Sequence, residues 1–493
     1  MTASTERLLP PQAPPRPRLT RTTGTALALI AASLPMFMST LDNLVMTTAL
    51  PVIRADLSAS LEQLQWMVNA YTLSFASLMI AAATLGDRIG RRRMFIVGIA
   101  VFGAGSVVSA LAGSAGMLIA ARAVQGAGAA AIMPLSLTLL ASAVTKERRA
   151  MAIGIWGAVS GLGVALGPVI GGAIVDGISW QAIFWLNVPV ALVSIPLIFR
   201  ALPESFGKRQ RLDLAGMFLA GIGVLSIVWG VIRGNDDGWT SAPVLIRLAL
   251  GAALLATFIW RERRTDHPLV PLRMFAVRSF TIANVTSFAF AVGVFGVIFV
   301  LSQYLQIGLG YTPLQAGLRT LPWTAAPMVV APLAGLLAPR VGVRPLLMVG
   351  LAFQAAGLAW IGLLIQGGTT SYPDFVPGLV LAGVGMGLTF APSATAVLAD
   401  MREAEHGTAS SVNATVREVG AAIGVASIVA VFQAAGGTLT PTGYAEGLGP
   451  AMLVGAAIIA VAAVAARWMP AETGRQGSTQ PAETGARASS QPA

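Results

Sequence analysis

The sequence predicts an all-α polytopic membrane protein, and three observations lead to this fold class. Hydrophobic residues make up 55% of the 493 residues and charged residues only 11%, whereas a soluble protein of this length would carry about 25% charged residues. The mean hydropathy is +0.74. Apolar runs of about twenty residues recur along the chain, and as helices such runs match the roughly 30 Å hydrocarbon core of a bilayer. A membrane β-barrel would instead show alternating segments of about ten residues.

The apolar segments predict fourteen transmembrane helices. They run over residues 25–53, 64–86, 93–113, 116–142, 150–175, 182–200, 212–233, 242–260, 280–306, 314–338, 344–366, 375–398, 409–434 and 448–468. If the chain starts in the cytoplasm, 26 of the 32 Lys and Arg residues fall on the cytoplasmic side of these spans. Positive residues favour cytoplasmic loops, so we expect cytoplasmic N- and C-termini. This topology also explains the net charge of +11, and we expect no nucleic-acid partner.

Both ends of the chain and an internal repeat suggest the domain organisation. Residues 1–24 are proline-rich and basic, residues 470–493 contain "PAETG" twice, and both tails are predicted to be disordered. "LGDRIGRRRMFIVG" (85–98) and "LAPRVGVRPLLMVG" (337–350) share R-x-G-x-R and a later glycine, at an offset of 252 residues. The repeat predicts two six-helix halves, residues 25–200 and 280–469. Residues 201–279 then form a linker with two extra helices.

The composition also limits the chemistry. The chain has no cysteine, and its two histidines, His267 and His406, fall in predicted loops. We therefore expect no disulfide and no metal site. No Walker-type nucleotide-binding motif is present, so we expect no ATP-driven function.

The "LGDRIGRRR" segment after the second span is the first motif. It places Asp87, Arg88, Arg91 and Arg92 in a turn where the small Gly90 permits a tight reversal. Cytoplasmic loops are commonly basic, which accounts for part of this pattern. The acid is more specific, because Asp87 can pair with a nearby Arg or interact with a helix N-terminus.

The second motif is "GVALGPVIGG" in the fifth span. Gly163, Gly167 and Gly171 recur every four residues on one helix face, and Gly172 lies beside them. Small residues at this spacing allow another helix to approach closely, and Pro168 bends the span because it removes a backbone donor. Ordinary tight helix packing is the alternative interpretation of this motif.

Charged residues within the spans are the third feature. Two acids, Asp42 and Glu418, lie well inside predicted spans. The basic residues within spans are Arg122, Arg247, Arg319 and Arg417. An ionisable group at the centre of a membrane helix costs about 2.5–3.5 kcal/mol on insertion scales and usually lines a cavity or pathway. Two interpretations stay open for Asp42 and Arg122, a functional pair or a static pair that fixes helix register. Glu418 is a second proton site, a cation-selecting acid or a structural ion-pair partner.

The motifs carry a resemblance to a known family. "LGDRIGRRR", "RAVQGAG" in the fourth span and "GVALGPVIGG" stand in the order seen in the major facilitator superfamily. With fourteen spans and "LDNLVMTTALP" in the first, the chain resembles the fourteen-helix drug:proton antiporter family over nearly its whole length, tails excepted. The resemblance implies the major facilitator fold, with two six-helix halves plus two extra central helices. It also implies proton-driven efflux of drugs, antibiotics or other lipophilic, often cationic small molecules by alternating access, without a cofactor.

The resemblance also implies roles for particular residues. Asp42 and Arg122 correspond to residues of the family's proton-coupling machinery. The glycine motif corresponds to the seal of the fifth span, and the Asp87 cluster to a cytoplasmic latch. The chain departs from its relatives at Glu418, where Gln is common after the Arg, and at Gln181, where Arg is common. Ala83 replaces a usual Gly at the start of the latch motif.

We expect the substrate cavity to be lined by adaptable, aromatic and polar side chains from several spans. Met38 and Met46 lie one turn either side of Asp42, and Tyr71 and Trp156 are expected to stack on a flat substrate. The full predicted set is Met38, Met46, Tyr71, Gln125, Trp156, Asn413 and Arg417.

Rival functions differ in the features they require. An uptake symporter on the same fold would keep the halves and the latch, and only the glycine motif and the extra helix pair argue against it. A membrane sensor would need a folded output domain, and the tails are too simple for one. No nucleophile–base pair within the spans supports an enzyme. The chain has 30 Arg but only 2 Lys, which indicates a high-GC bacterium, so we expect a bacterial cytoplasmic membrane as its location. We also expect a monomer.

Overall fold

A computed structural model describes residues 21–207, 213–266, 268–368, 371–402 and 405–470, and these ranges contain helices and no strand. Within them, fourteen helical segments are long and apolar enough to cross a membrane. The predicted all-α fold with fourteen spans is therefore confirmed. The largest difference is in the last span, which begins at Pro441 instead of residue 448. The Thr440 hydroxyl accepts from the Gly443 N–H (3.3 Å) and caps the helix there.

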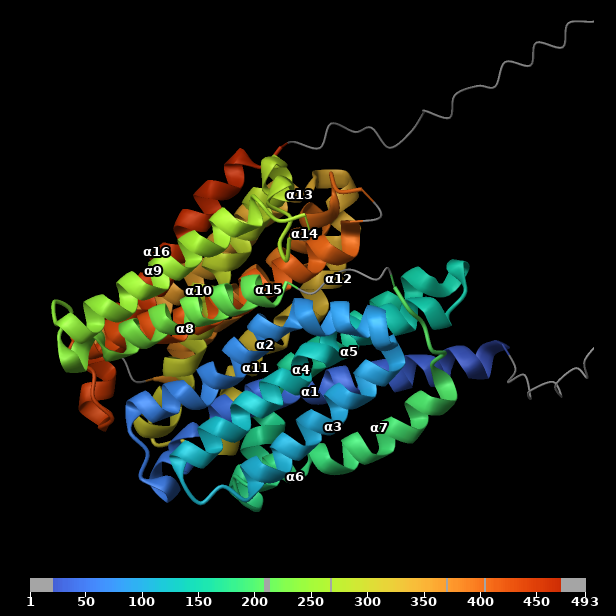
Figure 1. The fold of residues 1–493 in the computed structure, drawn as a ribbon. Helices are drawn as coiled ribbons and strands as arrows, with labels where there is room; N and C mark the ends of the chain where they lie inside the picture. The colour runs from blue at the N-terminus through green and yellow to red at the C-terminus, as the bar shows by residue number, and fades with distance from the viewer. Residues whose placement is uncertain (1–20, 208–212, 267, 369–370, 403–404, 471–493) are drawn as a thin grey trace, which may run out of the picture.

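The helices form two groups and a central pair (Figure 1). The first group contains α1 (Arg21–Leu57), α2 (Leu61–Ile89), α3 (Arg91–Ala110), α4 (Ala115–Ala143), α5 (Lys146–Gly177), α6 (Ala182–Trp185) and α7 (Asn187–Ala201). The central pair is α8 (Leu214–Asp237) and α9 (Ala242–Glu262). The second group contains η1 (Leu272–Ala276), α10 (Arg278–Ile307), α11 (Pro313–Thr324), α12 (Ala326–Val341), α13 (Val343–Gln366), α14 (Tyr372–Leu398), α15 (His406–Ala434), α16 (Pro441–Ala465) and η3 (Ala466–Trp468).

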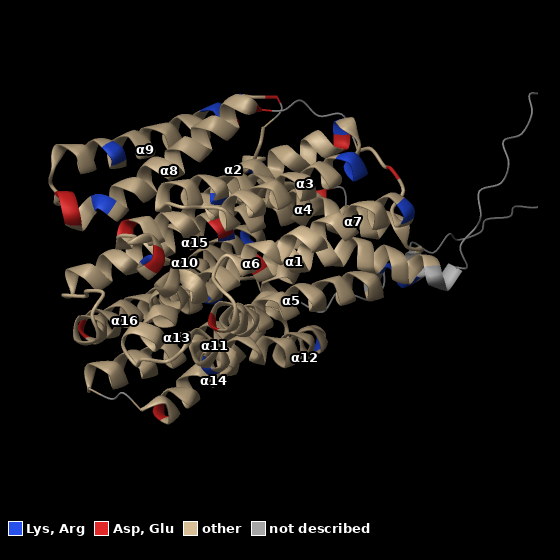
Figure 2. Ribbon diagram, turned by 90° about the horizontal axis from the view of Figure 1, so that it is seen from below, with Lys and Arg blue, Asp and Glu red and all other residues tan. Residues whose placement is uncertain are grey.

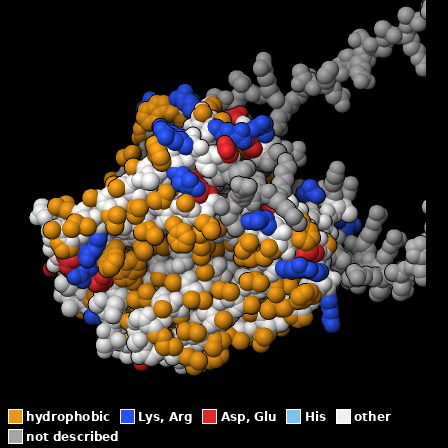
Figure 3. Space-filling view, viewed as in Figure 1, with side chains coloured by type: hydrophobic (Ala, Val, Ile, Leu, Met, Phe, Trp, Pro, Cys, Tyr) orange, Lys and Arg blue, Asp and Glu red, His pale blue; other side chains and the backbone are white. Residues whose placement is uncertain are grey.

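Both ends of the described chain leave the bundle on the same side (Figure 1). We call this the tail side, and we call the opposite side, which holds the α1–α2 and α5–α6 connections, the far side. Basic residues gather at several points of the tail side (Figure 2). Between the two sides, hydrophobic side chains cover much of the visible surface (Figure 3), as expected for a surface in contact with lipid.

Proline divides two of the spans into two helices. Pro189 has no N–H to donate to the Trp185 carbonyl, and the helix is interrupted at Leu186, between α6 and α7. Pro327 has the same effect four residues after Trp323, where α11 ends and α12 begins. The first break places Asn187 at the start of α7, in the interior of the bundle.

The internal repeat has a matching backbone conformation. Gly90 separates α2 from α3 with φ +116°, and Gly342 separates α12 from α13 with φ +88°. Side chains rarely adopt such positive φ angles, so glycine is favoured at both turns. The two copies of R-x-G-x-R thus form comparable helix-to-helix turns on the tail side.

The two groups meet along α5 and α11, α2 and α15, and α1 and α10. A Cβ atom on Gly172 would overlap the backbone of Pro313, and one on Gly317 would overlap the carbonyl of Pro168. Between α10 and α1, the Ser302 hydroxyl donates to the Thr47 carbonyl (3.2 Å). These contacts lie in the parts of the helices nearest the far side.

The tail-side part of α5 is packed differently. Cβ atoms on Gly154, Gly157 and Gly161 would meet nothing within 4 Å. The two groups are therefore joined closely on the far side, while α5 lacks such close contacts toward the tail side.

The central pair contacts both groups on the far side. Arg233 of α8 forms an ion pair with Glu62 of α2 (3.0 Å). Two residues along the same helix, the Asn235 amide donates to the Ala430 carbonyl of α15 (2.6 Å). Helix α8 therefore spans the junction between the two groups, and α9 packs on its outer face with a largely exposed apolar surface.

The close contact of α5 with α11 predicts a specific stability difference. Gly172→Ala should lower the thermal unfolding midpoint of the purified protein, because the new methyl group forces the two helix backbones apart; overpacking costs about 1–3 kcal/mol. Gly154→Ala in the same helix should leave the midpoint unchanged or raise it, since Ala favours helix over Gly by about 1 kcal/mol and the site is open. Differential scanning fluorimetry in detergent measures both, and equal midpoints for the two variants would contradict the contact.

Candidate functional site

An ion pair buried between α1 and α4 forms the centre of the candidate site. Arg122 Nη1 donates to Asp42 Oδ2, and the two side chains are 0% and 2% exposed. The structure therefore brings together the two residues that the sequence singled out on separate spans. Burying two charges is costly unless further hydrogen bonds compensate for the lost water, so the surrounding donors are important.

Two amide side chains complete the shell around Asp42. Asn187 Nδ2 donates to Asp42 Oδ1 (2.7 Å), and Gln125 Nε2 donates to the same oxygen (3.3 Å). Both amides also donate to the Ser106 hydroxyl of α3, at 3.1 Å and 2.7 Å. Helices α1, α4 and α7 thus meet at one carboxylate, and α3 contacts the two amides through Ser106.

Gln125 also connects the carboxylate to the guanidinium. Its Oε1 accepts from Arg122 Nη1 (3.0 Å) and from the Ser109 hydroxyl (3.1 Å). The amide therefore contacts both members of the ion pair, with donors toward Asp42 and an acceptor toward Arg122. This polarity stabilises the pair in its charged form.

Arg122 has two further contacts with α2. Its Nε donates to the Met67 carbonyl (3.3 Å), and its guanidinium lies 4.4 Å from the centre of the Tyr71 ring. The Tyr71 hydroxyl is hydrogen-bonded to the Ser39 hydroxyl of α1 (3.0 Å). Nη2 of Arg122 is buried and has no hydrogen-bond partner within the described part of the chain.

Glycines allow the helices of the site to approach closely. A Cβ atom on Gly126 of α4 would overlap the Tyr71 backbone of α2. One on Gly105 of α3 would lie 2.9 Å from the backbone nitrogen of Gln125. Because these positions lack side chains, Arg122 and Gln125 can reach Asp42 across short distances.

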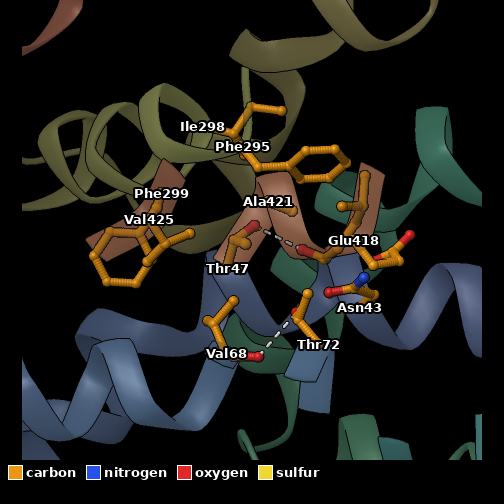
Figure 4. Close-up of a pocket in the computed structure, with 11 residues that line it drawn as sticks. Asn43, Thr47, Val68, Thr72, Phe295, Ile298, Phe299, Glu418, Ala421 and Val425 are labelled. Atoms are coloured by element: carbon orange, nitrogen blue, oxygen red, sulfur yellow. Dashed lines mark hydrogen bonds between the residues drawn. The ribbon is translucent and has the colours of Figure 1, made fainter. Parts of the chain in front are cut away.

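Glu418 lies outside this cluster, at the junction of the two groups. Together with Asn43, Thr47, Thr72 and Phe295 it lines a cavity of about 20 Å³ between α1, α2, α10 and α15 (Figure 4). A cavity of this size has room for about one water molecule. The nearest basic group is Arg417, whose Nη2 lies 3.8 Å from Glu418 Oε1, a longer separation than in a direct hydrogen bond.

The residues predicted to line the substrate cavity are distributed over the interior. Met38 and Met46 are buried in two different hydrophobic clusters. Trp156 donates to the Ser136 hydroxyl (3.2 Å), and Asn413 donates to Asn284 Oδ1 (3.2 Å). Arg417 lies 5.8 Å from the Phe390 ring. None of these residues lines the cavity beside Glu418, so their role as substrate contacts stays a prediction.

The glycine motif of the fifth span packs against two helices. Gly163, Gly167 and Gly171 face α1, where added Cβ atoms would contact Thr40, Leu44 and Val45 at 2.8–3.2 Å. Gly172 and Pro168 instead contact α11 of the second group. The motif thus joins α5 to α1 within one group and to α11 across the junction.

The latch motif forms a compact structure on the tail side. Asp87 pairs with Arg91 (2.6 Å), whereas the Arg88 side chain is exposed. The backbone N–H of Arg92 donates to Glu204 Oε1 (2.9 Å). Cβ atoms on Gly90 and on Gly207 would overlap the carboxylates of Glu204 and Asp87.

Backbone bonds hold the segment 202–207 on this turn. The Arg91 N–H donates to the Ser205 carbonyl (2.9 Å) and the Gly207 N–H to the Asp87 carbonyl (3.0 Å). All of these contacts lie in the first group and the segment that follows α7. We call the turn 87–92, on which the segment 202–207 packs, the latch turn.

A second charged cluster fixes the tail-side loops of the second group. Glu405 accepts hydrogen bonds from Arg402 (2.7 Å) and from Arg273 (2.8 Å). The bonds from Arg402 hold the pKa of the Glu405 carboxyl below its ordinary value. Within the described residues, no group of three or more His, Asp or Glu side chains could hold a metal ion.

Several residues of these networks were not singled out from the sequence, among them Asn187, Ser106 and Glu204. An asparagine within an apolar span is a recognisable signal, because an unpaired amide is costly in hydrocarbon. The contact of Glu204 with the latch turn depends on the fold and has no local signal.

Comparisons with known proteins indicate the family. The model of the Major Facilitator Superfamily matches residues 32–425. The multidrug resistance protein Stp of Mycobacterium tuberculosis is 36% identical over 410 residues, which cover 83% of this chain and 76% of that protein. The multidrug efflux pump LfrA of Mycolicibacterium smegmatis is 35% identical over 460 residues, 91% of each chain. The methylenomycin A resistance protein of Streptomyces coelicolor is 35% identical over 402 residues, 80% of this chain and 83% of that protein.

Solved structures show the same fold at lower identity. A bacterial homologue of the human lysosomal transporter Spinster, in an inward-facing conformation, matches with TM-score 0.64 and 19% identity over 90% of this chain and 98% of that chain. The xylose transporter XylE of E. coli, in a partially occluded inward-open conformation, matches with TM-score 0.64 and 14% identity over 92% and 99% of the two chains. The chain is a member of the Major Facilitator Superfamily, with fourteen membrane-spanning helices and relatives named as multidrug and antibiotic efflux proteins.

Proposed function

We propose that this protein exports drugs, antibiotics or other lipophilic, often cationic small molecules across a bacterial cytoplasmic membrane in exchange for protons. The observation that carries the proposal is the ion pair of Asp42 and Arg122, buried in a shell of hydrogen-bond donors. An ionisable pair within a membrane domain is costly and usually has a functional role. The relatives with 35–36% identity are named for multidrug efflux and antibiotic resistance.

The tail side is assigned to the cytoplasm. Most basic residues of the chain lie in the segments that connect spans on this side, which is the usual distribution for cytoplasmic loops. The close contacts of Gly172 with Pro313 and of Ser302 with Thr47 then lie on the outer side of the membrane. In this arrangement the outer entrance is closed, and substrate enters from the cytoplasm.

The proposed cycle uses Asp42 as the proton carrier. When the two groups separate on the outer side, Asp42 takes up a proton and its charge interaction with Arg122 is lost. Binding of a cationic substrate weakens and the substrate leaves. The groups then close on the outer side, Asp42 releases its proton to the cytoplasm and pairs again with Arg122, and the next substrate binds.

The membrane potential can drive this exchange without a cofactor. One elementary charge moving through 100 mV is worth roughly 2.3 kcal/mol. A free energy of this size supports about a fifty-fold concentration gradient, because about 1.4 kcal/mol corresponds to a factor of ten. Export of a neutral molecule in exchange for one inward proton gains directly from the potential, whereas one-for-one exchange of a singly charged cation is electroneutral and is driven by the pH difference.

Glu418 is the second proposed participant. Its side chain is largely buried at the junction of the two groups, and Arg417 Nη2 lies 3.8 Å from its carboxylate. Its neighbours in the cavity come from α1, α2 and α10 as well as α15. Movement of the groups would change these surroundings, which suits either a second proton site or a contact for a cationic substrate.

Replacing the central acid should abolish proton exchange. In everted membrane vesicles with an imposed pH gradient, lipophilic dyes and antibiotics should cause proton release with the wild-type protein and not with Asp42→Asn, because the amide cannot carry a proton. A pH-sensitive dye measures the release. Asp236→Asn is the control, since Asp236 is an exposed acid far from the pair, and it should behave as wild type.

The alternatives give distinct results in the same vesicles. Proton release that persists in Asp42→Asn and disappears in Glu418→Gln would move the proton site to Glu418. Absence of release with every compound in the wild type would contradict proton coupling.

Locking the outer contact should stop transport. Thr47 and Ser302 line one small cavity from α1 and α10, so a Thr47→Cys/Ser302→Cys protein should form a disulfide across the junction on oxidation. The chain has no other cysteine. Dye efflux from cells should then fall to background and recover with a reducing agent, because the two groups can no longer separate on the outer side.

The two single-cysteine variants are the matched controls, and their efflux should not respond to oxidation. Full transport by the double variant with its disulfide formed would contradict alternating access at this junction. Mass spectrometry of the purified protein measures disulfide formation independently of efflux.

A further inference from the structure

We propose that Asn187 is a positioning residue for proton exchange: its side-chain amide stabilises the ionised state of Asp42 and thereby sets the pH range of transport. This inference rests on the proposed function, in which Asp42 exchanges a proton. The role is carried by a residue on α7, a helix that contributes neither member of the ion pair.

The side-chain amide of Asn187 uses both of its N–H groups within this site. One N–H donates to Asp42 Oδ1 at 2.7 Å, and the same nitrogen donates to the Ser106 hydroxyl at 3.1 Å. An asparagine amide has two N–H donors, so both are used. The residue is 1% exposed, and water cannot replace these bonds from the bulk.

The break between α6 and α7 fixes the position of this amide. Pro189 has no N–H to donate to the Trp185 carbonyl, and α7 begins at Asn187, two residues before this proline. Asn187 is therefore the first residue of α7, and its side-chain amide donates to Asp42 of α1 and to Ser106 of α3.

The amide distinguishes the two protonation states of Asp42. A hydrogen bond from an N–H group is stronger to a carboxylate than to a neutral carboxylic acid. The amide nitrogen cannot accept a hydrogen bond from a protonated Asp42. In the reverse amide orientation, the Asn187 carbonyl oxygen would face the carboxylate and repel it, so the hydrogen-bond network selects the orientation with nitrogen toward Asp42.

Gln125 contacts both members of the ion pair, unlike Asn187. Its nitrogen is 3.3 Å from Asp42 Oδ1, and its carbonyl oxygen accepts from Arg122 and Ser109. Loss of Gln125 would therefore disturb the guanidinium as well as the carboxylate. Asn187 contacts Asp42 and Ser106 without contacting Arg122, so its removal leaves the hydrogen bonds of the guanidinium in place.

The ionisable groups around Asp42 come from three other helices. They are Arg122 of α4, Tyr71 of α2, whose ring lies 4.4 Å from that guanidinium, and Glu418 of α15, which lies outside the cluster at the junction. Substitution of the uncharged Asn187 leaves these charges in place. A change in the pH dependence of such a variant then reports the hydrogen bond.

The test is Asn187→Leu, a change of similar volume that removes the donors. In proteoliposomes, the pH at which dye transport is half-maximal on the alkaline side should rise by about one unit, which is a tenfold change in proton affinity. Asn235→Leu is the matched control. It removes an amide donor whose acceptor is a backbone carbonyl, so it can change the rate but should leave the pH of half-maximal transport in place.

A spectroscopic measurement gives the same information without transport. Infrared difference spectra of the purified full chain should contain a carboxylic acid band that Asp42→Asn lacks. This band should appear at a pH about one unit higher in Asn187→Leu than in the wild type. Asn187→Ser keeps a hydroxyl donor, so the pH at which its band appears should lie between the values of the wild type and Asn187→Leu.

Each outcome decides the inference. An unchanged pH of half-maximal transport and an unchanged infrared titration in folded Asn187→Leu would overturn it while leaving proton exchange at Asp42 intact. A wild-type protein whose transport does not depend on a proton gradient would overturn the proposed function and the inference with it. If both Asn187 variants fail to fold while Asp42→Asn folds, Asn187 has a structural role and the inference is wrong.

Discussion

The ion pair of Asp42 and Arg122 is the interaction on which the interior of the first helix group depends. Two charges in a membrane domain require donors and acceptors that water would otherwise supply. Gln125 and Asn187 supply donors to the carboxylate, and the Met67 carbonyl accepts from the guanidinium. Loss of one partner would leave the other charge buried, at a cost of about 3–5 kcal/mol. Arrangements of this kind tie α1, α2, α3, α4 and α7 to a single point, and glycines such as Gly126 allow the backbones to come close enough.

The junction between the two groups has a different chemistry. On the far side it is formed by glycine and proline backbones and by hydroxyl or amide bonds to carbonyl groups, such as Ser302 to Thr47. These contacts are close but uncharged, so separating them exposes few costly groups. Helix α8 adds one charged contact to α2 and one amide contact to α15 across the same junction. The extra pair of helices therefore contributes to holding the far side closed in this conformation. A charged core within one group and uncharged direct contacts between the two groups on the far side suit a protein in which the groups move as units.

Much of the fold could be predicted from the sequence, because long apolar helices have a strong signal and the basic loops orient them. Asp42 and Arg122 could also be identified from the sequence, because charged side chains are costly in hydrocarbon and therefore rare in membrane spans. The partner Asn187 was missed because its contact needs the helix break at Pro189 and the approach of α7 to α1. Glu204 was missed for a similar reason, as its position on the latch turn depends on how the segment after α7 folds back. Sequence patterns identify costly residues better than the neutral residues that satisfy them.

The central claim is that substrate and proton compete through Asp42, and proton release from purified protein tests it most directly. The detergent-solubilised protein, at a pH where Asp42 carries a proton, would be mixed with a transported dye in weakly buffered solution containing a pH indicator. We predict release of protons on substrate binding in the wild type and none in Asp42→Asn, at a dye concentration high enough for both proteins to bind it. Binding without proton release in the wild type, or equal release in both proteins, would contradict the account.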